Sequence, residues 1–231
     1  MTQHIGIVAC SAEGAALCYR AICAQGSRLL GPHAHPEVSI HSLSLSEYVD
    51  CLERGDMQGL ATLMLKSAKK LAKLGVDFLI CPDNTIHQVF DQVEAHLPRP
   101  LLHIAEVVAK AAVKRGYQRI GLVGTRWLVD SDVYTEKLAE RKLACVRPGA
   151  ADRDEINRII MDELVNGDFK PRSVAYFQQV FARMKADGCD AVILGCTEIP
   201  LIMNDSNAGL ATLDSTRLLA EAAVLRAVHT D

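Results

Sequence analysis

The sequence lacks the patterns that mark several large classes of protein. No apolar stretch in its 231 residues approaches the roughly 18–20 residues that a membrane-spanning helix needs. The segment Met1-Thr2-Gln3-His4 has no basic region followed by an apolar one, so we expect no signal peptide. Neither Gly-x-x-x-x-Gly-Lys nor Gly-x-Gly-x-x-Gly occurs, which argues against nucleotide and dinucleotide binding. We therefore expect neither a membrane segment nor a nucleotide cofactor.

An excess of charge of one sign is also missing. The chain has 25 Lys and Arg against 28 Asp and Glu, a formal net charge of −3. This balance argues against nucleic acid or an anionic membrane surface as a partner. None of the eight cysteines forms a Cys-x-x-Cys pair, so zinc-ribbon and thioredoxin spacings are absent. We expect free thiols in a reducing cytoplasm.

The one metal-like motif is incomplete. His33-Ala34-His35 resembles a metal-binding pair, but no carboxylate or further histidine is placed to complete the ligand set. We therefore expect an exposed loop and no metal site.

Short apolar runs alternate with amphipathic segments along the chain, whose apolar content is 49%. Strands are expected over residues 4–9, 37–43, 76–81, 101–104, 119–123, 143–146, 190–194 and 209–213. Strands that alternate with helices predict parallel sheets covered by helices on both faces. The fold class is therefore expected to be α/β.

Two strand segments recur in the second half of the chain. Ile5-Gly6-Ile7-Val8 is similar to Ile120-Gly121-Leu122-Val123, which starts 115 residues later. The segment 75–81 is similar to 188–194, at an offset of 113 residues. This repeat predicts two pseudosymmetric α/β domains, with a cleft lined by residues at the strand ends of both.

Cys196 is the most informative residue of the sequence. The apolar run Ala191–Leu194 predicts a buried strand, and Gly195-Cys196-Thr197-Glu198 then leads toward a helix. Ligands bind at the carboxyl ends of strands in open α/β sheets, and helix N-termini favour anions and thiolates. Cys196 is therefore predicted to be functional, with a buried structural thiol as the alternative.

Other residues follow strands in the same way. Asn84-Thr85 and Thr197-Glu198 both begin expected helices, where they can bind a carboxylate or cap the helix. Ser11 follows the first strand and is a further candidate contact. A cysteine on each side of a substrate could invert a stereocentre without a cofactor, since one thiolate removes a proton while the opposite thiol donates one.

These segments resemble the PLP-independent aspartate/glutamate racemase family. The resemblance is carried by Ile5-Gly6-Ile7, His41-Ser42, Asn84-Thr85-Ile86-His87, Leu102-His103-Ile104-Ala105, Gly121-Leu122-Val123-Gly124-Thr125-Arg126 and Gly195-Cys196-Thr197-Glu198-Ile199. It implies a cofactor-independent racemase of aspartate or glutamate, usually a homodimer. The domains implied are 1–100 with 208–231, and 101–207. Cys196 would be one acid/base, Thr197 a substrate contact and Lys170 a residue near the distal carboxylate.

The second acid/base stays open between Cys81 and Asp83. The family pattern places one residue between its first cysteine and Asn-Thr, whereas Cys81-Pro82-Asp83-Asn84-Thr85 has two. An offset of 113 pairs Cys196 with Asp83, and an offset of 115 pairs it with Cys81. A slip of one residue along a strand turns a side chain to the other face. The departure also allows a single-cysteine decarboxylase or double-bond isomerase, or a binding protein without activity.

Overall fold

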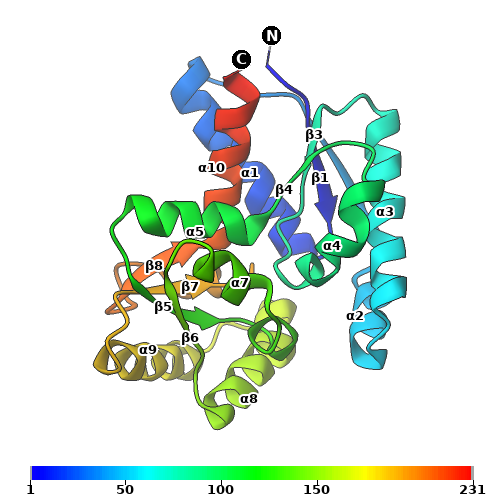
Figure 1. The fold of residues 1–231 in the computed structure, drawn as a ribbon. Coiled ribbons are helices and arrows are strands. Elements are labelled where there is room, and N and C mark those ends of the chain that lie inside the picture. Colours follow the sequence, from blue (N-terminus) through cyan, green and yellow to red (C-terminus); the bar gives the residue numbers. More distant parts are fainter. Residues whose placement is uncertain (1, 230–231) are drawn as a thin grey trace. The chain divides into compact units, whose positions relative to one another are not determined.

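The computed structural model describes residues 2–229 of the chain. These residues form two compact units (Figure 1). Unit 1 contains the described residues up to Ile104 together with those from Thr216 onward, and unit 2 is Ala105–Ser215. None of the described helices is both long and apolar enough to span a membrane.

Unit 1 is built on a parallel four-stranded sheet of order β2-β1-β3-β4. Its strands are β1 (Ile5–Ala9), β2 (Val38–Ser42), β3 (Phe78–Ile80) and β4 (Leu101–Leu102). All the side chains of β1 and β3 are buried, as expected for central strands of a parallel sheet covered on both faces.

Helices cover both faces of this sheet, α1 and α10 on one side and α3 on the other (Figure 1). The helical segments of unit 1 are α1 (Ala12–Leu30), α2 (Leu45–Arg54), α3 (Met57–Lys73), η1 (Thr85–Val89), α4 (Phe90–Val93), η2 (Glu94–His96) and α10 (Ser215–Val228). Gly55 separates α2 from α3 and has φ 65°, a left-handed conformation that glycine adopts without strain. The chain therefore forms two helices here instead of one continuous helix.

Unit 2 repeats the architecture with a parallel sheet of order β6-β5-β7-β8. Its strands are β5 (Arg119–Val123), β6 (Ala144–Val146), β7 (Ala191–Leu194) and β8 (Ala211–Asp214). Its helical segments are α5 (Ile104–Lys114), α6 (Arg126–Val129), α7 (Val133–Ala139), α8 (Ala150–Arg158), η3 (Ile159–Glu163, a π-helix), η4 (Leu164–Asn166), α9 (Pro171–Ala186) and η5 (Ile199–Leu201).

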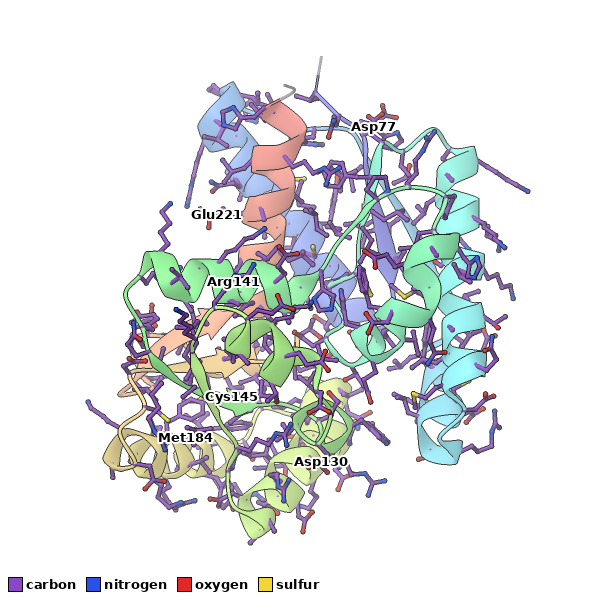
Figure 2. The ribbon with its side chains drawn as sticks, in the orientation of Figure 1. Asp77, Asp130, Arg141, Cys145, Met184 and Glu221 are labelled. Carbon is purple, nitrogen blue, oxygen red and sulfur yellow. The ribbon has the colours of Figure 1, made fainter. Side chains whose placement is uncertain are left out.

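A glycine lets α9 approach this sheet closely. A Cβ added at Gly121 in β5 would lie 2.7 Å from Sδ of Met184, which α9 places against the sheet (Figure 2). Real side-chain carbons do not approach so closely, so a larger residue at position 121 would push the helix or its methionine away. The glycine of the recurring Ile-Gly motif therefore serves helix–sheet packing in unit 2.

The observed elements confirm the α/β fold and refine two boundaries. Strand β8 pairs with β7 over its whole length, so unit 2 extends to Ser215, whereas the expected domain ended at residue 207. Strand β3 ends at Ile80, so Cys81 lies just beyond the strand that was expected to include it. The end of unit 2 and the end of β3 are both set by hydrogen bonds between strands. A local apolar pattern in the sequence does not reveal these hydrogen bonds.

Candidate active site

The carboxyl ends of β1 and β3 bring four polar side chains of unit 1 together. Cys10 follows β1, Cys81 and Asp83 follow β3, and Tyr48 comes from α2. Cys81 is completely buried, and its thiol points to the carbonyl oxygen of Asp83 at 3.8 Å. Tyr48 is 1% exposed and was not anticipated from the sequence, because nothing local separates it from an ordinary core residue. We call these four residues the unit 1 group.

Burial holds two members of the unit 1 group in their neutral forms. Burial is the main cause that raises the pKa of the Cys10 thiol well above its usual range, with smaller contributions from Cys81 and Asp83. Burial also raises the pKa of the Tyr48 phenol, with Cys10 and Cys81 as further causes. Cys10 is therefore a packed, protonated thiol.

Asp83 lies two residues before η1, the 3₁₀ segment that follows β3. Its Oδ1 accepts a hydrogen bond from the Ile86 amide at 3.1 Å, so the Asp83 side chain caps this segment. Asn84 and Thr85 lie beside it and are 2% and 8% exposed. Ser11 caps α1 by accepting from the Gly14 amide at 3.1 Å. The candidate contacts of unit 1 thus lie at two neighbouring strand ends.

His87 links the turn that contains Asp83 to the start of α5 through two hydrogen bonds. Its Nδ1 donates to the Asp83 carbonyl oxygen at 2.9 Å, which leaves Nε2 to accept from the Ile104 amide at 3.3 Å. Because both ring nitrogens have these partners, only one neutral tautomer fits. Burial, together with neighbouring His103, lowers the pKa of His87 to about 3. His87 is therefore a neutral positioning residue for the turn.

In unit 2 the corresponding strand end carries a thiol and a buried carboxylate. Cys196 follows β7 and is half-buried, and its Sγ donates to Oε2 of Glu198 at 2.9 Å. Thr197 Oγ1 donates to the same oxygen at 2.8 Å. Glu198 is only 3% exposed. The Glu198 carboxylate, a predicted substrate contact, thus accepts hydrogen bonds from both the Cys196 thiol and the Thr197 hydroxyl.

Gly195 shapes the path of the chain into this site. A Cβ at position 195 would lie 2.6 Å from a Leu128 side-chain carbon and 2.8 Å from the Val123 carbonyl oxygen. The backbone can pass this close to β5 only without a side chain. The Gly-Cys step is therefore required to place Cys196 at the strand end.

Lys170 lies elsewhere in unit 2, at the start of α9. Its ammonium contacts Asp168 at 2.7 Å and Glu163 at 3.6 Å. Glu163 is 1% exposed, accepts from Ser173, and pairs with Arg158 at 3.0 Å and Arg172 at 3.3 Å. The Ser173 hydrogen bond is the main cause that lowers the pKa of Glu163 to about 2, and Arg158, Lys170 and Arg172 lower it further. This carboxylate was missed from the sequence because its partners come from three different segments.

Replacing Glu163 by Gln should destabilise the protein by about 2 kcal/mol at pH 7, because charged hydrogen bonds to a buried carboxylate are lost. The lowered pKa stabilises the folded protein above pH 4.5, and this contribution disappears as the pH falls to about 2. Denaturant unfolding should therefore show a difference between wild type and variant that narrows on acidification. Asp168→Asn, which removes the more exposed partner of Lys170, should change the stability by less than about 0.5 kcal/mol. If Glu163→Gln left the unfolding free energy unchanged, the stabilising role of the buried Glu163 carboxylate would be contradicted.

No group of three His, Cys, Asp or Glu side chains within residues 2–229 is placed to bind a metal ion. The His33 backbone amide donates to Ser27, and the His35 ring contacts the Pro36 carbonyl oxygen and the edge of the Tyr19 ring. All eight cysteines are free thiols. The polar strand ends of the two units therefore offer acid/base groups, hydroxyls and amides.

A model of the Asp/Glu/Hydantoin racemase family matches residues 5–223, nearly the whole chain. The chain belongs to this family.

Relatives of this racemase family member match most of its length. A broad specificity amino-acid racemase of Bacillus subtilis is 22% identical over 193 residues, which are 82% of this chain and 81% of that protein. The structure of a proposed Asp/Glu racemase from Yersinia pestis is 30% identical, covers 98% of this chain and 100% of its own, and has a TM-score of 0.89. An aspartate racemase homologue from Pyrococcus horikoshii is 27% identical, covers 99% and 100%, and has a TM-score of 0.85. The homologues are amino-acid racemases, which are isomerases.

Proposed function

We propose that this family member racemises an acidic amino acid, aspartate or glutamate, without a cofactor. The observation that carries the proposal is the hydrogen bond from the Cys196 thiol to the buried Glu198 carboxylate. A half-buried thiol at a strand end can meet a small substrate, and an adjacent carboxylate can accept its proton. Cys196 is the proposed acid/base on one face of the substrate, and its hydrogen bond to Glu198 is proposed to hold the thiol in position.

The second acid/base comes from the end of β3 in unit 1, where Cys81 and Asp83 are the candidates. In the proposed reaction one group removes the Cα proton while the other delivers a proton to the opposite face. Charge that develops on the substrate carboxylate needs hydrogen-bond donors. Ser11, Asn84, Thr85 and Thr197 are the proposed donors, and their neighbouring backbone amides support this role.

Lys170 is the proposed partner of the second carboxylate of an acidic substrate. Its ammonium is about one-third exposed, and its nearer carboxylate, Asp168, is half exposed. A substrate carboxylate could replace Asp168 while the buried Glu163 keeps the ammonium in place. We also propose that the enzyme acts as a homodimer in the cytoplasm, as the family resemblance and its eight free thiols suggest.

The test is chiral chromatography of L- and D-aspartate and L- and D-glutamate incubated with purified protein and no added cofactor. At least one pair should approach a 1:1 mixture from both enantiomers. Decarboxylation products, or a change in thermal stability with dicarboxylates without turnover, would instead favour the single-cysteine or binding alternatives. Absence of racemisation for both acidic amino acids would contradict the proposal.

A further inference from the structure

The sheet registers decide between the two offsets of the internal repeat. Ile5 of β1 lies opposite Phe78 of β3, and Ile120 of β5 lies opposite Ala191 of β7. Ile5 and Ile120 are the equivalent positions of the two Ile-Gly motifs. Their partners Phe78 and Ala191 are therefore equivalent too, which sets an offset of 113 residues for β3 and β7. At this offset Asp83 is the counterpart of Cys196.

Burial along the two segments gives independent support. Every residue of Phe78–His87 is buried except the sixth, and the same holds for Ala191–Pro200. The sixth residues are Asp83 and Cys196, both half-buried. Cys81 corresponds to Leu194, and these two side chains are 0% and 1% exposed. Cys81 therefore occupies a core position of the repeat, and Asp83 occupies the position at the strand end.

The hydrogen bonds after the strands repeat as well. The Ile86 amide donates to the Asp83 carboxylate, and the equivalent Ile199 amide donates to the Cys196 carbonyl oxygen at 3.2 Å. The first turn thus closes on the same residue in each unit, through a side chain in unit 1 and through backbone in unit 2. The Cys81 thiol instead points back to the Asp83 carbonyl oxygen and packs beside Cys10.

We infer that Asp83, rather than Cys81, is the second acid/base of the proposed racemisation. The inference rests on the proposed function and names the acid/base residue that unit 1 contributes to it. For one enantiomer, the Asp83 carboxylate takes the Cα proton, and the electron pair of the broken C–H bond passes into the substrate carboxylate. The Cys196 S–H bond then breaks as its proton forms a new C–H bond on the opposite face. Asp83 is left as the acid and Cys196 as the thiolate, and exchange with water restores both.

Asp83→Asn separates catalysis from capping, because Asn caps helices as well as Asp but is not a base. This variant should lose at least about 100-fold in racemisation. It should still exchange the Cα proton of one enantiomer with D2O, since Cys196 can remove and return a proton on one face. Cys196→Ser should show the complementary exchange of the other enantiomer. Cys81→Ala tests the rival assignment: if Asp83 is the acid/base, this variant should racemise within about threefold of wild type, with folding checked by thermal unfolding.

Asp83→Cys gives a readout that a purely structural role would not change. Racemisation needs one group ionised and the other protonated, so the activity plateau lies between their titrations. Thiols titrate about 4–5 pH units above carboxyl groups, so the acidic limb of kcat/KM should move upward by several units in this variant. This readout remains available if Cys81→Ala fails to fold.

Three outcomes would count against the inference. Loss of racemisation in folded Cys81→Ala with retention in Asp83→Asn would assign the role to Cys81. An unmoved acidic limb in an active Asp83→Cys variant would also overturn it. If wild type neither racemises nor exchanges any enantiomer of aspartate or glutamate, the proposed function fails first, and the inference fails with it.

Discussion

Cys196→Ser should lower racemase activity by about 10²–10⁴-fold, the range expected when a positioned acid/base group is lost. Serine keeps the shape of the side chain and can still donate to Glu198, so the fold and the Thr197–Glu198 hydrogen bond should survive. A hydroxyl is a far weaker acid than a thiol, so the proton transfer itself should be impaired. Initial rates from both enantiomers of the active substrate measure the effect.

Cys23 provides a matched control for this substitution. It is also a half-buried free thiol, but it lies on α1 of unit 1 rather than at a strand end. Cys23→Ser should keep the wild-type rate within about twofold, since substitutions away from functional and core features have small effects. Equal rates for Cys196→Ser and wild type would remove Cys196 from the mechanism.

The unfolding free energy should fall by roughly 1.4 kcal/mol per pH unit below pH 6.5 because of His87 alone. The pKa of His87 is lowered from 6.5 to about 3 in the folded protein, so the unfolded chain binds a proton first as the pH drops. The stabilising contribution is complete above pH 6.5 and is lost progressively toward pH 3. At pH 4.5 the loss is roughly 2–3 kcal/mol, a large part of the stability of a typical domain.

His87→Asn should remove this part of the pH dependence, although the variant itself should be less stable at pH 7. Urea unfolding between pH 4.5 and 7 measures the slope for wild type and variant. His96→Gln, at an exposed position after α4, is the control. If His87→Asn kept the full wild-type slope, the description of His87 as a neutral ring with a hydrogen bond at each nitrogen would be wrong.

The fold was predictable because its signals are local. Apolar runs such as Ile5–Ala9 and Ala191–Leu194 are too short for helices, and amphipathic segments separate them. The Gly-Cys step before Thr197 likewise pointed to a strand end from the sequence alone.

What the sequence left open depends on contacts between distant segments. The choice between Asp83 and Cys81 rests on the pairing of β1 with β3, some 70 residues apart. The assignment of β8 to unit 2 rests on its pairing with β7. The Glu163 cluster depends on α8, the π-helix η3 and the start of α9 folding against one another. Composition and periodicity report none of these contacts.

The most direct test of the account is the isotope content of the product formed in D2O at initial rate. Wild type should convert either enantiomer into its mirror image with one deuterium at Cα per turnover, because the proton delivered comes from a group exchanged with water. Product that retains the original protium would show that one group removes and returns the same proton, and would contradict the proposed reaction, in which separate groups remove and deliver the proton.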